Sequence, residues 1–284
     1  MSDNPLKSYF RQPKIYISLP TPEKFYPTGC IEPTETGELP VYPMTAKDEL
    51  NFKTPDALLN GQATVDVIQS CIPNIKNAWL LPSTDLDAIL IAIRIATYGE
   101  MMDVNTTIPV INEERTYQLD LRTILDELKA ESFDEFITID NLVVWIRPLN
   151  YREFTTSALK TFEEQRVFNI VNNEDLTEEQ KLNQFHKSFK KLTELTVGMV
   201  SASIVQIDTD SDSVTDPQFI DEFLQNADKK FYTTITEHIE QQKKKFSVKP
   251  LTVTTEAEDQ ERGAPASYEA PVMFDQSNFF AQKY

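Results

Sequence analysis

The stretch STDLDAILIAIRIATYG, residues 83–99, is apolar around most of a helix circumference. Ser83 or Thr84 can cap the start of this helix, which continues through Tyr98, and Gly99 can end it. A helix that is hydrophobic on all sides is buried in the interior of a protein. We therefore expect this helix to form the centre of an N-terminal core. Arg94 lies inside the apolar run, and we expect it to pair with a nearby carboxylate or to reach the helix edge, with ligand binding as the alternative.

Shorter helices, interrupted by prolines and a glycine, precede this segment from residue 46 onwards. Thr54–Pro55 fits a cap followed by proline at the first helical position, and Asn60–Gly61 can end that helix. A second helix is expected from Ala63 to Cys71.

Residues 14–20, KIYISLP, alternate apolar and polar side chains as a strand does. The proline-rich segment that follows predicts extended strands or a hairpin with irregular connections.

Residues 100–148 have the character of a small α+β insertion. A helix is expected at residues 122–130, RTILDELKA. Strands are expected at residues 106–111, 115–121, 135–140 and 142–149.

Residues 151–248 follow an almost entirely helical pattern. Thr177 and Gln180 fit a capping box at the start of a long helix. One stripe of this helix is expected to face the core, and it comprises Leu182, Phe185, Phe189, Leu192, Thr196 and Met199. Residues 208–217 are interpreted as a polar loop, and Asp216–Pro217 begins another helix. The spacing predicts a hairpin of two long helices that packs on a third.

The C-terminal segment changes character. Residues 254–271 are acidic and rich in small residues and proline, which predicts a poorly ordered linker. Phe274, Phe279 and Phe280 follow close together. Such an ending is typical of a docking peptide, which would bury its aromatic rings against this chain's own core or against a partner.

These patterns together predict an α+β fold with three parts. Residues 14–148 form a strand-and-helix module that includes the insertion at about 100–148. Residues 149–248 form a helical domain, a long-helix hairpin or bundle. Residues 249–284 form an acidic linker that ends in an aromatic docking segment.

The charge of the chain restricts its partners. The 284 residues carry a formal net charge of −18, so the chain should repel nucleic acids and anionic membranes. No apolar run approaches the roughly 18 residues of a membrane span, and the N-terminus lacks the apolar core of a secretory signal. With only Cys30 and Cys71, a disulfide scaffold is excluded. We therefore expect a cytoplasmic protein.

The sequence offers little for catalysis. His186 and His238 lie within expected helices, and neither has a convincing nucleophile nearby in the sequence. Asp208, Asp210 and Asp212 superficially resemble a calcium loop, but an EF-hand starting at Asp208 would need glycine and glutamate where the chain has Ser213 and Phe219. We predict no catalytic residue, no metal and no cofactor. A hydrolase that uses two carboxylates is the remaining enzymatic alternative.

One long stretch carries a resemblance. Residues 39–104 read LPVYPMTAKDELNFKTPDALLNGQATVDVIQSCIPNIKNAWLLPSTDLDAILIAIRIATYGEMMDV. This stretch resembles the baseplate hub protein family of T-even-type contractile-tailed bacteriophages. Residues 15–29, IYISLPTPEKFYPTG, are similar to the opening of that family, and residues 274–280, FDQSNFF, to its closing motif. The resemblance covers most of the first 150 residues and the last dozen.

The chain departs from this family at its cysteines. Many members carry cysteine pairs in the insertion and before the closing motif, which suggests metal knuckles. The matching stretches here contain no cysteine. We therefore expect hydrogen-bonded turns or strand pairing in their place.

The resemblance implies a non-enzymatic part in building the tail baseplate hub, as a hub component or an assembly factor. A transient chaperone for another tail protein and a carboxylate-dependent cell-wall hydrolase are the alternatives. The expected partners are other hub proteins and tail-tube or tape-measure proteins, with self-association as an open alternative, but neither nucleic acid nor membrane. Assembly is expected in the host cytoplasm, with the virion tail as a possible destination. The candidate partner-binding residues are Phe274, Asp275, Phe279, Phe280, Phe52, Leu58 and Leu59. A core position is the open alternative for each aromatic or leucine side chain.

Overall fold

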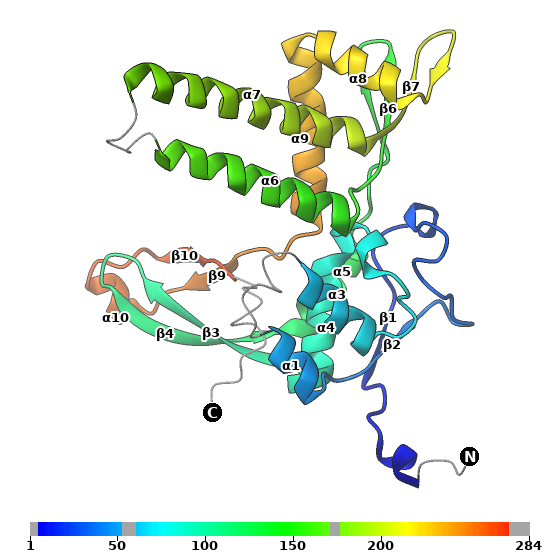
Figure 1. Cartoon of the computed structure of the whole chain (residues 1–284). Coiled ribbons are helices and arrows are strands. Elements are labelled where there is room, and N and C mark those ends of the chain that lie inside the picture. The colour runs from blue at the N-terminus through cyan, green and yellow to red at the C-terminus, as the bar shows by residue number, and fades with distance from the viewer. Residues whose placement is uncertain (1–4, 53–60, 171–176, 273–284) are drawn as a thin grey trace.

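The computed structural model describes residues 5–52, 61–170 and 177–272. Helices are combined with small separate sheets, three of two strands and one of four, which confirms the α+β class (Figure 1). The elements up to the central helix are η1 (Pro5–Tyr9), β1 (Ile15–Ile17), η2 (Glu23–Phe25), β2 (Leu39–Val41), α1 (Ala46–Phe52), α3 (Gln62–Cys71), η3 (Ala78–Leu80), η4 (Ser83–Asp85) and α4 (Leu86–Tyr98).

Helix α4 lies at the centre of the N-terminal core, as predicted. Ile89, Ile91 and Ile93 have no exposed surface, and the β1–β2 pair and α3 pack around them. Gly99 ends the helix with a φ of 94°. The start differs from the prediction, because Ser83 and Thr84 belong to the 3-10 turn η4 and cap nothing. The Thr84 hydroxyl instead lies 2.7 Å from that of Thr21.

Two buried carboxylates fasten the irregular N-terminal segment to this core. Asp85 accepts hydrogen bonds from the Tyr26 hydroxyl at 2.5 Å and the Thr21 amide at 3.0 Å. Asp48 accepts from the Thr45 amide at 2.7 Å, and Arg11 lies 3.4 Å from the same carboxylate. These polar contacts add to the β1–β2 pairing and to the packing of Ile17 in the core.

The start of helix α3 depends on a glycine. Gly61 precedes it with a φ of 76°, a conformation that glycine adopts without strain. The predicted helix from Ala63 to Cys71 is confirmed with a start one residue earlier. The helix expected at Thr54–Pro55 lies outside the described residues.

The middle of the chain forms a long hairpin and a helix. Strands β3 (Met101–Ile108) and β4 (Glu113–Asp120) pair antiparallel, and α5 (Leu121–Ala130) packs on α4. The first strand begins five residues earlier than predicted and stops before Pro109. Val110 and Asn112 adopt positive φ angles, so residues 109–112 form a turn and not the end of a strand.

A four-stranded sheet overturns part of the helical prediction. Its order is β5 (Phe136–Ile139), β6 (Leu142–Ile146), β7 (Ile204–Asp208) and β8 (Ser213–Val214), all antiparallel. Residues 204–214 were expected to be helix and loop, but β7 completes the sheet beside β6. The β6–β7 pairing joins residues on both sides of the domain boundary expected at residue 148, and that division stays a prediction.

The next helices along the chain are α6 (Tyr151–Ile170), α7 (Glu178–Ser203), α8 (Pro217–Asn226) and α9 (Lys229–Lys245). Helices α6 and α7 form the predicted hairpin, which projects away from the N-terminal core (Figure 1). The Thr177–Gln180 capping box and the Asp216 cap are confirmed. The helix expected to run on from Asp216–Pro217 is broken, because Asp228 caps a new helix through the Phe231 amide.

The acidic segment expected to be a poorly ordered linker is instead folded through residue 270. Strands β9 (Leu251–Thr254) and β10 (Ser267–Ala270) pair antiparallel around α10 (Ala257–Glu261). Figure 1 shows this unit beside the β3–β4 hairpin. Arg115 lies 3.3 Å from Asp259, and Arg262 pairs with Glu113. Strand pairing therefore holds each of the two stretches that lack the cysteine pairs, as expected, and ion pairs join them.

Candidate protein-interaction surface

The predicted partner-binding residues fall mostly in the parts of the chain that the structure leaves out of its description. Phe274, Asp275, Phe279, Phe280, Leu58 and Leu59 lie outside the described residues. Phe52 is described, and only 2% of it is exposed. It packs in the N-terminal core, in keeping with the core alternative. Leu50, on the same helix, presents the exposed apolar side chain.

The structure exposes an apolar surface that the sequence placed in the core. On α7, Leu182 is 59% exposed and Phe189 is 60% exposed, and Phe185 lies between them at 40%. The rings of Phe185 and Phe189 stack with their centroids 6.5 Å apart. We name the side chains of Leu182, Phe185 and Phe189 the α7 stripe. The same face of α7 continues beyond the stripe toward the C-terminal end of the helix, where Leu192 and Met199 are half-buried.

The difference follows from where the other helices pack. The second core draws on the C-terminal end of α7, where Val200 is 5% exposed, and on α8 and α9 through Leu224 and Ile235. Among the described elements, α6 accompanies α7 along the hairpin, and the hairpin extends beyond this core (Figure 1). A stripe with helical spacing predicts that one face of a helix is buried. It does not predict how much of the helix length is packed against other elements.

A groove of about 510 Å³ separates α6 and α7 on another side of the hairpin. Its lining alternates charges, with Lys160 and Glu163 on α6 and Lys191 and Glu194 on α7. Gly198 widens the groove, because no other atom lies within 4 Å of the position that a Cβ would take. Both glutamates are exposed to solvent, so the groove has the character of a polar surface channel.

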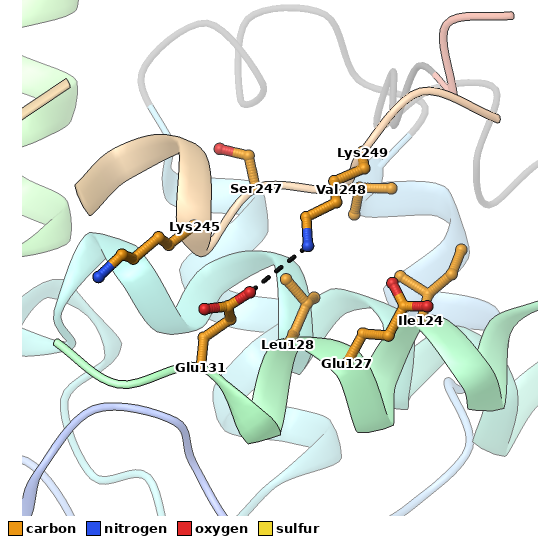
Figure 2. A pocket seen from close by; sticks show the side chains of 8 residues that line it. All are labelled: Ile124, Glu127, Leu128, Glu131, Lys245, Ser247, Val248 and Lys249. Atoms are coloured by element: carbon orange, nitrogen blue, oxygen red, sulfur yellow. Dashed lines mark hydrogen bonds and ion pairs between the residues drawn. The ribbon is translucent and has the colours of Figure 1, made fainter. Parts of the chain in front are cut away.

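A second hollow lies where the chain returns from α9 to the N-terminal core. Figure 2 shows Ile124, Leu128 and Glu131 of α5 and its end facing Val248 and Lys249. The Lys249 ammonium lies 3.4 Å from the Glu131 carboxylate. The hollow holds about 10 Å³, which is room for about one water molecule. It is a packing seam rather than a ligand pocket.

The same seam joins α9 to the segment after α5. Gln242 and Lys245 donate hydrogen bonds to the Asp134 carboxylate at 2.8 and 2.5 Å. These donors hold the pKa of Asp134 below its usual value, with Lys245 as the first cause. The contacts fix the direction of α9 relative to the core, and α7 and α8 pack on α9 in turn.

The acidic loop that superficially resembled a calcium site serves the four-stranded sheet. Asp208 accepts hydrogen bonds from the Trp145 indole at 2.6 Å, the Gln206 amide at 2.7 Å and the Ser213 hydroxyl at 2.5 Å. These bonds, led by that of Ser213, lower the pKa of Asp208. Within residues 5–52, 61–170 and 177–272, no three carboxylate, imidazole or thiol side chains gather as metal ligands would.

The groups that could support catalysis are dispersed. His186 lies exposed on α7, whereas a ring nitrogen of His238 lies 3.3 Å from the Asp134 carbonyl. Cys30 and Cys71 are both fully buried, and burial raises the pKa of each thiol to about 12. Burial also raises the pKa of Asp85 to about 6, but Asp85 lines neither of the two hollows. None of the described helices has the length and apolar character that crossing a membrane requires.

Comparison with protein families gives a match: the model of the T4 bacteriophage base plate protein family matches residues 30–262. The chain therefore belongs to the T4 bacteriophage base plate protein family. Neither the curated proteins nor the solved structures include a match to it. Membership supports a structural role in the phage baseplate and contacts with other tail components, and it is compatible with a non-enzymatic protein.

Proposed function

We propose that this chain is a non-enzymatic component or assembly factor of the baseplate hub, acting through contacts with other hub and tail proteins. The observation that carries the proposal is the α6–α7 hairpin, which exposes three large apolar side chains on α7 beyond the folded core. Exposed apolar patches on soluble proteins mark interaction sites. A baseplate protein meets its neighbours along such surfaces.

The charge of the chain supports selective contacts. A net charge of −18 favours basic surfaces and opposes association with other acidic proteins. Buried aromatic and aliphatic anchors usually supply most of the affinity of an interface. We therefore assign affinity to the apolar side chains and partner choice to the charged ones.

The C-terminal residues 273–284 supply a second proposed contact. Phe274, Asp275, Phe279 and Phe280 are our candidates there, with Leu58 and Leu59 as further candidates in the sequence between α1 and α3. Deleting residues 272–284 should weaken complex formation and leave the circular dichroism spectrum helical. If the truncated chain unfolds, this segment belongs to the core instead.

Co-expression with the hub, tail-tube and tape-measure proteins of the same virus tests the function. We expect a complex that survives size-exclusion chromatography. Mass spectrometry of purified virions then separates a hub component, which is present in finished particles, from a transient assembly factor or chaperone, which is absent. If the chain co-elutes with none of these proteins, the proposal fails.

Peptidoglycan turnover by the purified chain would favour the cell-wall hydrolase instead. That activity needs an acid with a raised pKa facing a second carboxylate across a cleft. Asp85 has the raised pKa, but its carboxylate is buried and accepts hydrogen bonds from Tyr26 and Thr21. The groove carboxylates Glu163 and Glu194 are exposed, and each lies beside lysines of the same lining.

A further inference from the structure

The turn of the β3–β4 hairpin is apolar and strained. Pro109, Val110 and Ile111 follow the last residue of β3, and Val110 is 70% exposed. Its φ is 74°, a left-handed conformation that a β-branched residue adopts only under strain. Strain in an exposed run of apolar residues is typical of positions that serve a contact rather than the folded core.

The C-terminal unit lies directly beside this turn. A Cβ atom at Gly263 would lie 3.7 Å from a methyl carbon of Val110, so the turn meets the chain just after α10. Figure 1 shows the turn and α10 side by side at the end of the hairpin that is remote from α4. We name Val110 and the exposed glutamates Glu256, Glu258 and Glu261 the distal surface.

The charge of this part of the chain is strongly negative. Residues 109–116 and 255–264 hold six carboxylates and two arginines, which is a net charge of −4. The two arginines pair with Asp259 and Glu113, so their positive charges are neutralised within the unit. The three glutamates of the distal surface face solvent, and the net charge of −18 on the whole chain adds to their field.

We propose that the distal surface binds a basic face of another baseplate protein. Val110 packs into an apolar depression of that face, and the three glutamates meet its lysine or arginine side chains. An apolar centre with a charged rim is the usual organisation of a protein interface. Complementary charge selects the partner and speeds association. This inference rests on the proposed function and adds a contact surface and the chemistry of its partner.

Other occupants fit the distal surface less well. A second copy of the chain carries the same net charge of −18, and nucleic acid is repelled for the same reason. A metal ion would need carboxylates that converge on one point. The described part of the chain holds no group of three acidic, histidine or cysteine side chains arranged in that way.

Photo-crosslinking in the assembled complex tests the proposal. A photo-reactive amino acid replaces Val110 in the full chain, which is co-expressed with the hub and tail proteins of the same virus. After irradiation, mass spectrometry should find the crosslinked peptide in another baseplate protein, in a segment with a net positive charge. Crosslinks to a second copy or to an acidic segment would overturn the proposal. So would a complex that forms without any intermolecular crosslink from this position.

The Val110→Asn variant separates a contact role from a structural one. Asparagine tolerates the left-handed conformation better than valine does, so this variant should raise the thermal unfolding temperature of the isolated chain. The same change removes the apolar anchor and should weaken the affinity for the complex by about tenfold or more. Loss of both stability and affinity would show that Val110 packs within the chain, and an unchanged affinity would show that it anchors nothing.

Charge reversal tests the glutamates independently. Glu258→Lys with Glu261→Lys should weaken the affinity by about tenfold or more and reduce its dependence on salt concentration. The matched control is Glu222→Lys with Glu237→Lys, on α8 and α9. It replaces two exposed glutamates and changes the net charge of the chain by the same amount. The control should leave the affinity unchanged.

The two proposals can fail separately. If the complex forms and the charge reversal weakens it no more than the control does, the distal surface is not the docking site, while the baseplate function stands. If the unmodified chain forms no complex with any of these proteins, both proposals are wrong. The replaced glutamates are all exposed, so the variants should stay folded, and circular dichroism confirms this for each.

Discussion

The Tyr26 hydroxyl donates a 2.5 Å hydrogen bond to Asp85, a carboxylate with no exposed surface, and so joins the irregular N-terminal segment to the 3-10 turn η4 directly before the central helix. Burial disfavours the charged form of Asp85, and its pKa rises to about 6. The bonds from Thr21 and Tyr26 oppose this shift without cancelling it.

Because its pKa is raised in the folded state, Asp85 should stabilise the folded chain most at low pH. A folded pKa of about 6 against an ordinary value of 3.8 means that the folded state binds the proton more tightly. The stabilisation is complete below pH 3.8 and is lost as the pH rises through 6. Asp85→Asn should remove this loss, which amounts to roughly 3 kcal/mol in the free energy of unfolding over the whole range and to roughly 2 kcal/mol between pH 4.5 and 7. Urea unfolding of both proteins between pH 4.5 and 7 measures the difference, and parallel curves would contradict the assignment.

The ion pairs between the two hairpins should hold the C-terminal unit in place. Arg115→Ala with Arg262→Ala removes the contacts with Asp259 and Glu113, so the amides of β9 and β10 should exchange hydrogen faster. High salt should produce part of the same effect in the unaltered protein, because exposed ion pairs are screened. Arg122→Ala is the control, since Arg122 has the same 45% side-chain exposure and pairs with Glu100 elsewhere. Equal exchange in all three proteins would show that strand pairing alone positions the unit.

The sequence predicted the elements that depend on residues close together in the chain. The central helix follows from its all-round apolar composition, and the start of α7 from the Thr177–Gln180 capping box. Strand β7 was missed because residues 204–208 follow a long helical stripe directly. The buried residues Ile204 and Ile207 are three positions apart because the pairing with β6 is irregular at Trp145 and Ile146, so the sequence shows no alternation that would mark a strand.

Contacts between distant residues explain the other errors. The acidic composition of residues 254–271 predicts disorder, but Arg115 and Asp259 are 144 residues apart in the sequence and meet only in the fold. The α7 stripe was assigned to the core for a related reason. Helical spacing identifies an apolar face, whereas the extent of its burial depends on where α8 and α9 pack.

Replacing Gly61, at the junction of α3 and α6, should cost more stability than replacing Gly37. A Cβ there would lie 3.1 Å from the Tyr151 hydroxyl and 3.2 Å from both Thr155 and Trp79. Gly37 has a similar φ of 77°, but no atom within 4 Å of its Cβ position. Gly37→Ala should therefore cost about 1 kcal/mol of backbone strain alone. Gly61→Ala should cost about 1–3 kcal/mol more, through crowding. Thermal unfolding of the two variants gives the comparison, and equal losses would mean that the neighbours move aside freely.

Truncation of an apolar side chain should lower the free energy of unfolding strongly in the core and hardly at all on the stripe. Ile91 has no exposed surface, so Ile91→Ala should lower the free energy of unfolding by about 2–5 kcal/mol. Leu182 is 59% exposed, so Leu182→Ala should change it by about 0.5 kcal/mol or less. Urea unfolding of the isolated chain measures both values. A loss at Leu182 comparable with that at Ile91 would place the stripe in the core of the free protein. The stripe would then be a packed face of the free chain and not a contact surface.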